Sequence, residues 1–383
     1  MRRFGWILVV LTMAAPAWAA KKLSVEQLQD LLHSLRQANK TDAEVATELQ
    51  QIELTEELTK STIDSLASFV PGPLTTDQIY VLEARSAVLA PPAADLPSTP
   101  APDAAAQKAL LDKAVDYATK TYAQLPHLTA TKTTFRFQDV PNPPNAANQG
   151  KPAGKTEPGS ASGGTSIFYV GQTVTQVESQ SGAEILSKVK DPTPWGVNGQ
   201  IALLGQGPVL STVVQQAQAA GKIAWLRWET VYGRQTAVFS FAVDKKKSHY
   251  AVNYCCFPNT DQARLNMVNQ NVQPGFSGNI QAVTDWSPFK ATAPYHGELF
   301  VDAQTGIVVR LVTEAEFKPY ETVHQENTCI DYGTVTVGGN PLVLPVRTLI
   351  ATEVIPSGGE STGKRPTLRT LFTIEYKDFK PAS

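Results

Sequence analysis

From residue 129 onward, apolar and polar residues alternate in one segment after another. Alternation is typical of a β-strand with one buried face, because successive side chains point to opposite sides. The clearest segments are TATKTTFRFQD (129–139), IAWLRWETV (223–231), TAVFSFAVD (236–244), SHYAVNYC (248–255), LVLPVRTLIATEV (342–354) and LRTLFTIEYKDF (368–379). One helical pattern interrupts the series, at 208–220. We therefore expect an α+β fold, with a long, curved antiparallel sheet packed with one or two helices.

The residues before this series have a helical pattern. Between 23 and 89, leucine, isoleucine and valine recur at helical spacing. Three Ser/Thr-x-x-Glu/Gln sequences, beginning at Ser24, Thr41 and Thr75, have the form of capping boxes at helix starts. A further helix is expected over 107–125. The apolar residues predict the core of a small helical domain, and the alternative is that they form a surface that binds a partner protein.

Two segments of low complexity divide the chain. Residues 90–106 are rich in Pro and Ala, which is typical of a semi-rigid, extended linker. Residues 141–164 are rich in Pro, Gly, Asn and Ser, and we expect a disordered insertion there between two strands. The chain is therefore expected to contain a helical domain at 20–89 and a domain of helix and antiparallel sheet at 107–383.

The first nineteen residues have the features of a secretory signal peptide. Arg2 and Arg3 precede a short apolar stretch, and Ala17-Trp18-Ala19 forms a small-x-small cleavage site. The apolar stretch is too short for a transmembrane anchor, which needs about 20 apolar residues. We therefore expect residues 1–19 to be cleaved and the product to be periplasmic or extracellular.

The charge balance does not favour a nucleic-acid partner. The formal net charge is −2, and loss of Arg2 and Arg3 with the signal peptide makes it −4. Binding to nucleic acid or to an anionic membrane depends on clusters of basic residues. No later stretch is long and apolar enough to span a bilayer, so no integral membrane segment is expected after cleavage.

The chain has three cysteines, Cys255, Cys256 and Cys329. Export to an oxidising compartment favours one disulfide and one remaining thiol. Adjacent Cys255 and Cys256 point to opposite faces of a strand, so only one of them could face Cys329. A bridge between Cys256 and Cys329 is the candidate, and unpaired thiols are the alternative.

No catalytic or metal-binding motif is convincing. The five histidines lack the His-x-x-x-His and His-Glu-x-x-His spacings of zinc sites. The sequence GFSGN at 275–279 does not have the Gly-x-Ser-x-Gly spacing of a serine nucleophile. GQGP at 205–208 lacks the Lys-Ser/Thr of a phosphate loop. We therefore expect no metal, no cofactor and a function that is not enzymatic.

Aromatic residues of the strands are the main candidates for ligand binding. They could line an apolar cavity that binds an acyl chain or an apolar segment of a partner. The alternative is that they are core residues covered by the helices at 107–122 and 208–220. The candidate residues are Trp225, Trp228, Phe239, Phe241, Tyr250, Phe300 and Phe372.

The segment HGELFVDAQTGIVVRL at 296–311 has the form of a β-hairpin. One predicted face is apolar, whereas the other mixes Phe300 with Glu298, Asp302 and Arg310. A mixed face indicates partial cover by another element or by a ligand. We expect a cross-strand ion pair between Arg310 and either Glu298 or Asp302.

Several stretches resemble an uncharacterised family of exported proteins from acidobacteria. The stretches are AVDYATKTYAQLPHLTATKTTFRF (114–137), VFSFAVDKKKSHYAV (238–252), GELFVDAQTGIVVRL (297–311) and DYGTVTVGGNPLVLPVRT (331–348). The resemblance implies export and a shared architecture but no particular activity. More loosely, the sheet region is similar to periplasmic lipoprotein carriers and anti-sigma-factor regulators. That resemblance implies a half-barrel plugged by helices, with acyl chains bound in its concavity.

Three functions are consistent with these patterns. The first is an exported, non-catalytic binding protein that holds an apolar ligand, or a lipidated or extended partner segment, on a curved sheet. The second is an envelope interaction module whose helical domain contacts a partner protein. The third is a hydrolase without a recognisable motif, which ranks last because no set of residues specifies its active site.

Overall fold

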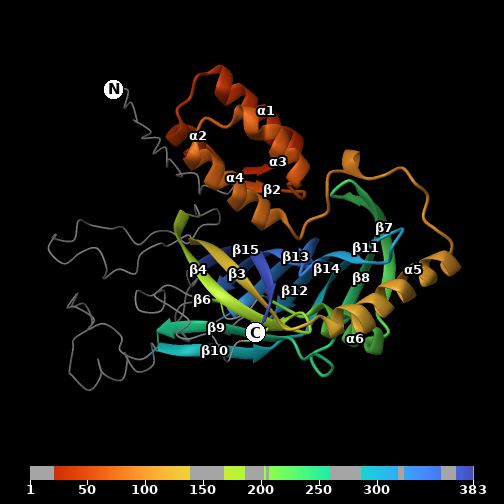
Figure 1. Cartoon of the computed structure of the whole chain (residues 1–383). Coiled ribbons are helices and arrows are strands. Elements are labelled where there is room, and N and C mark those ends of the chain that lie inside the picture. Colours follow the sequence, from red (N-terminus) through yellow and green to blue (C-terminus); the bar gives the residue numbers. More distant parts are fainter. Residues whose placement is uncertain are drawn as a thin grey trace, which may run out of the picture.

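The computed structural model describes residues 21–138, 168–185, 202–203, 207–258, 286–317, 323–354 and 368–382. The expected signal peptide, the insertion at 141–164 and the GFSGN sequence at 275–279 lie outside this part of the chain. Figure 1 shows a helical lobe beside a larger lobe built on a sheet. Within the described residues, no helix is both long enough and apolar enough to cross a membrane.

The helical lobe contains residues 21–89 and is called the helical domain below. Capping boxes at Ser24 and Thr41 open its first two helices, as expected. The expected third box is not formed, because α4 begins earlier, at Pro73, and the Thr75 hydroxyl donates to Asp42 (2.7 Å). The elements are β1 (Lys21–Leu23), α1 (Val25–Gln37), α2 (Asp42–Leu49), β2 (Ile52–Leu54), α3 (Lys60–Leu66), η1 (Ala67–Phe69) and α4 (Pro73–Ser86).

Ten strands of the described residues form one antiparallel sheet, in the order β5-β4-β3-β15-β14-β13-β12-β11-β8-β7. The order has two ends, so the sheet is open, and the expected α+β fold with a large antiparallel sheet is confirmed. The strands are β3 (Leu128–Gln138), β4 (Phe168–Gln180), β5 (Ala183–Glu184), β7 (Ile223–Val231), β8 (Arg234–Val243), β11 (Tyr295–Asp302), β12 (Val308–Glu316), β13 (Val323–Val337), β14 (Asn340–Val354) and β15 (Leu368–Pro381).

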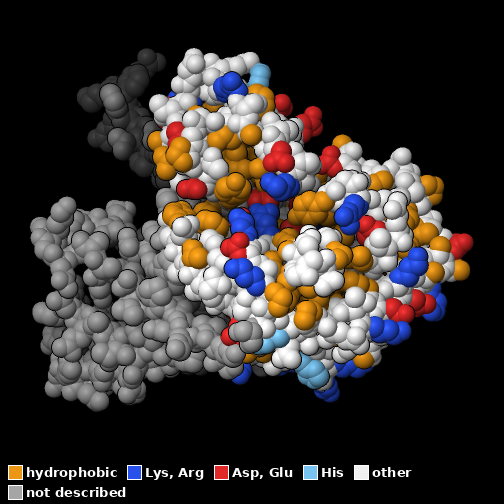
Figure 2. All heavy atoms as spheres, in the orientation of Figure 1, with side chains coloured by type: hydrophobic (Ala, Val, Ile, Leu, Met, Phe, Trp, Pro, Cys, Tyr) orange, Lys and Arg blue, Asp and Glu red, His pale blue; other side chains and the backbone are white. Residues whose placement is uncertain are grey.

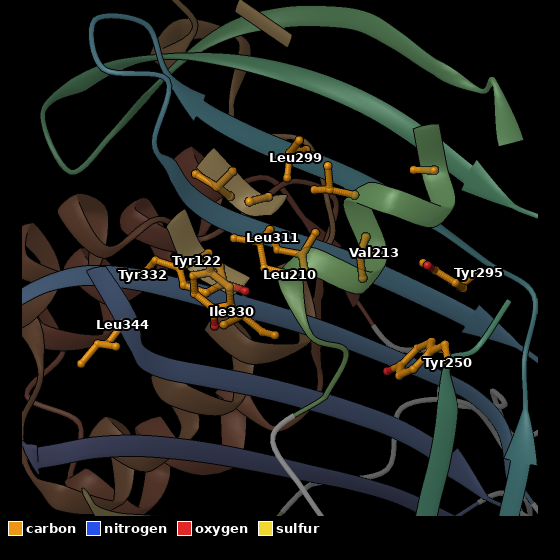
Figure 3. Close-up of a cluster of buried hydrophobic side chains, with 14 of the residues drawn as sticks. Tyr122, Leu210, Val213, Tyr250, Tyr295, Leu299, Leu311, Ile330, Tyr332 and Leu344 are labelled. Carbon is orange, nitrogen blue, oxygen red and sulfur yellow. The ribbon is translucent and has the colours of Figure 1, made fainter. Parts of the chain in front are cut away.

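One face of this sheet, called the inner face, is covered by α5 (Ala104–Asp116) and α6 (Leu210–Ala220) (Figure 1). The helix expected over 107–125 ends as a π-turn, η3 (Tyr117–Thr121), and a 3-10 turn, η4 (Tyr122–Gln124). Apolar side chains from both helices and from the strands form one continuous core (Figure 3). This core is where the burial of apolar area stabilises the sheet lobe.

A second, smaller sheet adds to the inner side. Its order is β10-β9-β6, formed by β6 (Ala202–Leu203), β9 (Ala251–Pro258) and β10 (Trp286–Thr292). Val252 on β9 and Tyr250 just before it join the inner core, and both are buried. The smaller sheet therefore covers apolar strand residues that would otherwise face solvent.

The opposite face, called the outer face, packs against the helical domain. Val81, Ala84 and Ala87, on and just after α4, contact strand residues that include Phe300 and Leu349. The mixed outer side of the hairpin at 296–311 is therefore covered by another element, as its composition indicates. A sheet buried on both faces needs apolar residues on both.

Cys329 lies in this outer-face cluster as a free, buried thiol. The disulfide predicted between Cys256 and Cys329 is therefore absent from the structure. Cys329 stands opposite Val312 on β12, on the side of the sheet that faces α4, whereas β9 belongs to the smaller sheet on the inner side. The side chain of Cys256 lies outside the described residues.

The linker between the two lobes runs past the end of the large sheet at β7 (Figure 1). It contains one short 3-10 turn, η2 (Ala93–Asp95). The indole N–H of Trp228 donates to the Pro100 carbonyl (2.9 Å), which fixes the linker against β7. Proline cannot donate to a strand ladder, so a Pro-rich segment beside an end strand discourages pairing with another chain.

Candidate functional site

The seven aromatic residues predicted to bind a ligand do not form one site. Phe239, Phe241, Tyr250 and Phe372 are buried in the inner-face core. Phe300 is buried on the opposite side, in the outer-face cluster. The seven residues are thus divided between the two faces of the sheet.

The two predicted tryptophans are partly buried on β7. Trp225 packs edge-on against Trp228, with ring centroids 4.9 Å apart, and against Phe239 at 5.7 Å. Both rings pack against the inner-face core. Their contacts with other side chains and with the linker indicate that they hold the β7 end of the sheet together.

A cavity of about 20 Å³ lies against the inner face, lined by described residues such as Leu128, Leu344 and Tyr376. This volume is of the size that holds a single water molecule. An acyl chain does not fit this cavity, and the candidate aromatic side chains of the inner face are buried in the core.

Polar groups inside this core bond to one another. The Tyr250 hydroxyl donates to Glu326 and lies 3.4 Å from the Thr328 hydroxyl. The Tyr295 hydroxyl donates to the Gln216 amide oxygen (3.0 Å). Burial, reinforced by the charge of Glu326, raises the pKa of Tyr250 well above its usual value. These tyrosines, which lie near each other in Figure 3, are therefore hydrogen-bonded structural groups.

A larger cavity lies on the other side of the sheet, between the helical domain and the outer face. It has a volume of about 430 Å³ and is lined by residues of α3, α4, β3, β4, β14 and β15. We call it the seam cleft. In Figure 2, charged side chains gather in the recess between the two lobes, with hydrophobic side chains beside them. Volumes of a few hundred Å³ are typical of small-molecule sites.

Four aromatic side chains line the seam cleft: Tyr80 from α4, Phe135 and Phe137 from β3, and Tyr169 from β4. Tyr80 is 41% exposed and Tyr169 is 43% exposed, so both rings are accessible. The Phe137 ring packs edge-on against Tyr169, with centroids 5.6 Å apart. This contact holds an otherwise accessible aromatic ring at the wall of the cleft.

Charged side chains complete the lining, and most of them have partners. Arg347 on β14 forms a two-pronged ion pair with Glu83 on α4, with both N–O distances 2.6 Å. Glu375 on β15 pairs with Lys377 (2.7 Å). Lys60 on α3 pairs with Asp64 (3.4 Å), and both of these side chains are exposed. The Arg347–Glu83 pair connects the helical domain to the sheet at the cleft.

Asp77 on α4 is the remaining acid of the lining, and no ion pair joins it to another described residue. Partial burial and, secondarily, the nearby Asp42 carboxylate raise the pKa of Asp77 above its usual value. Asp42 itself is engaged at the start of α4, where it accepts from the Thr75 N–H (2.9 Å). The Asp77 carboxylate is therefore the acid of the cleft that has charge to offer to a ligand.

A buried charge network continues along the outer face from the cleft. Arg310 pairs with Glu57 of the helical domain and with Asp331 on β13, each at 2.7 Å. Its guanidinium also lies 5.7 Å from the Phe300 ring centroid. Arg310 thus connects the two lobes through a charge pair and, on the sheet, through a cation–π contact.

The ion pair predicted between Arg310 and Glu298 or Asp302 is not formed. Arg310 stands opposite Phe300 on β11, and its side chain turns to β13 and the helical domain instead. Glu298 pairs with Arg227 through two bonds of 2.9 and 2.7 Å. Asp302 lies 3.5 Å from Arg234. Both acids therefore pair with arginines of β7 and β8, the strands that lie on the side of β11 away from β12.

The described residues do not assemble a metal centre. No group of three or more His, Cys, Asp or Glu among them could hold a metal ion. His127 pairs with Glu178 (2.8 Å), and His296 lies 3.5 Å from Glu314. These histidines occupy separate places in the sheet.

Tyr80, Tyr169 and Asp77 were not among the residues predicted from the sequence. Asp77 and Tyr80 are three apart on α4, and Glu83 follows at the same spacing, so they share one face of the helix. A stripe of polar and aromatic residues beside the apolar stripe of α4 was therefore the sequence signal that could have indicated this wall of the cleft. The sequence gives no such signal for Tyr169, because its position at the cleft depends on its pairing with Phe137 on the neighbouring strand.

Comparison of the chain with known protein families gives no matching family, and comparison with curated proteins gives no match. Function is therefore inferred from the geometry of the seam cleft.

Proposed function

We propose that this chain is an exported, non-catalytic binding protein whose ligand occupies the seam cleft. The observation that carries the proposal is the contrast between the two faces of the sheet. The outer side has a cleft of about 430 Å³ with accessible aromatic side chains, whereas the inner-face cavity of about 20 Å³ holds no more than a water molecule. Concave sites with apolar walls and a few polar groups are typical of ligand binding.

The construction of the cleft supports binding between two rigid walls. One wall is α3 and α4 of the helical domain, and the other is the outer face of the sheet. The Arg347–Glu83 pair and the buried Arg310–Glu57 pair fix these walls relative to each other. A preformed site loses less conformational entropy when the ligand binds.

Titration of the mature protein with N-phenyl-1-naphthylamine, a neutral apolar fluorophore, tests the proposal. We expect a saturable rise in its fluorescence. Ile63→Trp, which adds bulk at the cleft wall, should weaken binding at least tenfold. Leu226→Trp is the matched control, because position 226 is exposed on β7, outside the cleft lining, and binding should be unchanged.

Two results would contradict this proposal. One is the absence of saturable binding by the native protein. The other is unchanged binding by Ile63→Trp, provided that its circular dichroism spectrum and thermal transition remain those of a folded protein. Either result would mean that the seam cleft does not bind a neutral apolar ligand of this kind.

Export is part of the proposal and has its own test. The features of residues 1–19 are those of a signal peptide with a cleavage site after Ala19. Intact-mass measurement of the protein from the periplasm or medium of an expressing bacterium should give a chain that begins at Ala20. A chain that stays in the cytoplasm with residues 1–19 attached would contradict export.

A second candidate function is the envelope interaction module. A cavity of about 350 Å³ lies on the helical domain itself, lined by residues that include Arg36, Lys40 and Phe69. Arg36 lies over the Phe69 ring, 5.7 Å from its centroid. In this function a partner protein would contact that surface. Loss of a specific partner from pull-downs with Phe69→Ala, but not with Ile63→Trp, would favour it over the seam cleft.

A further inference from the structure

We propose that the seam cleft selects a small organic ammonium ion, which lies against Tyr80 and Tyr169 and pairs with Asp77. This inference rests on the proposed function, because it takes the cleft as the ligand site and adds the chemical class of the ligand. It follows from the aromatic walls, from the charge balance of the lining and from the pairing of its charged groups.

The aromatic walls suit a cation. The rings of Tyr80 and Tyr169 are both partly exposed, and they come from opposite walls of the cleft, α4 and β4. The faces of aromatic rings carry negative electrostatic potential and attract ammonium groups within about 6 Å of the ring centroid. Phe135 and Phe137 extend this lining and would contact the carbon attached to the ammonium nitrogen.

The charge balance of the lining favours a cation over an anion. Among the described residues, two cationic side chains, Lys60 and Arg347, and three acidic ones, Asp77, Glu83 and Glu375, line the cleft. This described lining carries one net negative charge. Arg347 is held by Glu83, and Lys60 has Asp64 beside it. An anionic ligand would meet a net negative lining whose cations already have partners.

Asp77 distinguishes a cation from a neutral ligand. It is partly buried, its pKa is raised, and no other described residue forms an ion pair with it. A neutral ligand that closed the cleft would desolvate this carboxylate further without compensation, which is costly. An ammonium group would compensate its charge and lower its pKa again.

Isothermal titration of the full mature chain at pH 7.5 tests the inference with three probes of similar size. The probes are benzyltrimethylammonium, which is cationic, benzyl alcohol, which is neutral, and phenylacetate, which is anionic. We expect the cation to bind at least tenfold more tightly than either of the others. Added salt should weaken the binding of the cation, because a charge pair contributes to it.

Variants assign the selectivity to named residues. Asp77→Asn should weaken benzyltrimethylammonium binding about fivefold to tenfold, whereas benzyl alcohol binding should stay the same or become tighter, because no carboxylate is then desolvated. Tyr80→Leu keeps an apolar side chain but removes the ring, and it should weaken the binding of benzyltrimethylammonium by a similar factor. Asp112→Asn is the matched control, because it removes an exposed acid of α5 that does not line the cleft. This control should bind the cation as the native protein does.

The failures of the two proposals are distinguishable. If the neutral fluorophore binds in the cleft but the cation binds no better than benzyl alcohol, the ammonium inference is wrong and the cleft remains a ligand site. If the cation binds tightly but Asp77→Asn has no effect, the assignment of the site is wrong. If neither the fluorophore nor any of the three probes binds, both proposals are overturned.

Discussion

At the scale of single residues, the outer face is governed by a few buried charges. Glu57 is enclosed by Arg310, Glu229 and Asp331. Burial, opposed by Arg310 and reinforced by the two acids, raises the pKa of Glu57 from 4.5 to about 7. Glu57 is therefore the carboxyl group of this network that takes up a proton near neutral pH, chiefly because it is buried.

The raised pKa of Glu57 makes stability depend on pH. The folded state binds this proton more tightly than the unfolded state. The protonated carboxyl therefore favours folding fully below pH 4.5, and this contribution is lost as the pH rises from 4.5 to about 7. Glu57→Gln, which keeps the shape without the charge, should equal the native protein in stability near pH 4, below the unfolded pKa. At pH 8.5 it should be more stable, by on the order of 3 kcal/mol. Urea unfolding at both pH values measures this, and a difference that does not change with pH would contradict it.

At the scale of elements, the sequence predicted where most strands of the sheet lie but not the register in which they pair. Alternating residues located most strands, because one buried face imposes a period of two. The β-bulge between Phe300 and Val301 could not be predicted in this way. It moves Val308 to the inner-face core and Val309 to the outer-face cluster, the reverse of what uninterrupted alternation predicts. A register shift leaves no mark in a pattern of apolar residues alone.

The turn of the β11–β12 hairpin is fixed by local chemistry. Asp302 accepts from the N–H groups of Gln304 (3.0 Å) and Thr305 (2.9 Å). Burial acts to raise the pKa of Asp302, but these hydrogen bonds outweigh it, so its pKa is lowered. Gly306 then has a positive φ of 75°, which few other residues adopt easily. The Asp-x-x-Thr-Gly sequence is thus explained by turn structure.

Gly306→Ala should destabilise the protein through two effects. The first is the positive φ, and the second is a methyl group that would lie 2.5 Å from the Lys113 Cβ on α5. Gly233→Ala is a matched control, because Gly233 has a similar φ of 74° and open space around it. We expect the Gly306 variant to lose about 1 to 2 kcal/mol more than the control in urea unfolding. Equal losses would show that α5 does not pack on this turn.

At the scale of the whole molecule, the position of the helical domain could not be predicted from the sequence. The contacts that fix it join residues very far apart along the chain, 253 positions for Arg310 and Glu57 and 264 for Arg347 and Glu83. Local patterns predicted that a helical domain and a sheet exist. Because the seam cleft forms only where the two meet, local patterns could not predict the site.

The buried ion pairs should make the two lobes unfold together. Arg310→Met leaves Glu57 and Asp331 without their cation, and we expect a loss of about 3 to 5 kcal/mol. Calorimetry should then show the helical domain melting before the sheet, whereas the native protein should melt in one transition. Arg36→Met, which changes an exposed arginine of α1, should keep the single transition. Two transitions in the native protein would contradict a firmly fixed interface.

The most direct test of the seam cleft as a ligand site is to map which amides respond to a bound ligand. Amide chemical shifts of the chain without residues 1–19 would be followed by nuclear magnetic resonance during titration with N-phenyl-1-naphthylamine. We predict that the largest changes fall at Asp77–Glu83 on α4, at Phe135–Phe137 on β3 and at Tyr169 on β4, around the seam cleft. Changes centred instead on Phe239, Phe241 and Tyr250 would place the ligand on the inner face and contradict the account.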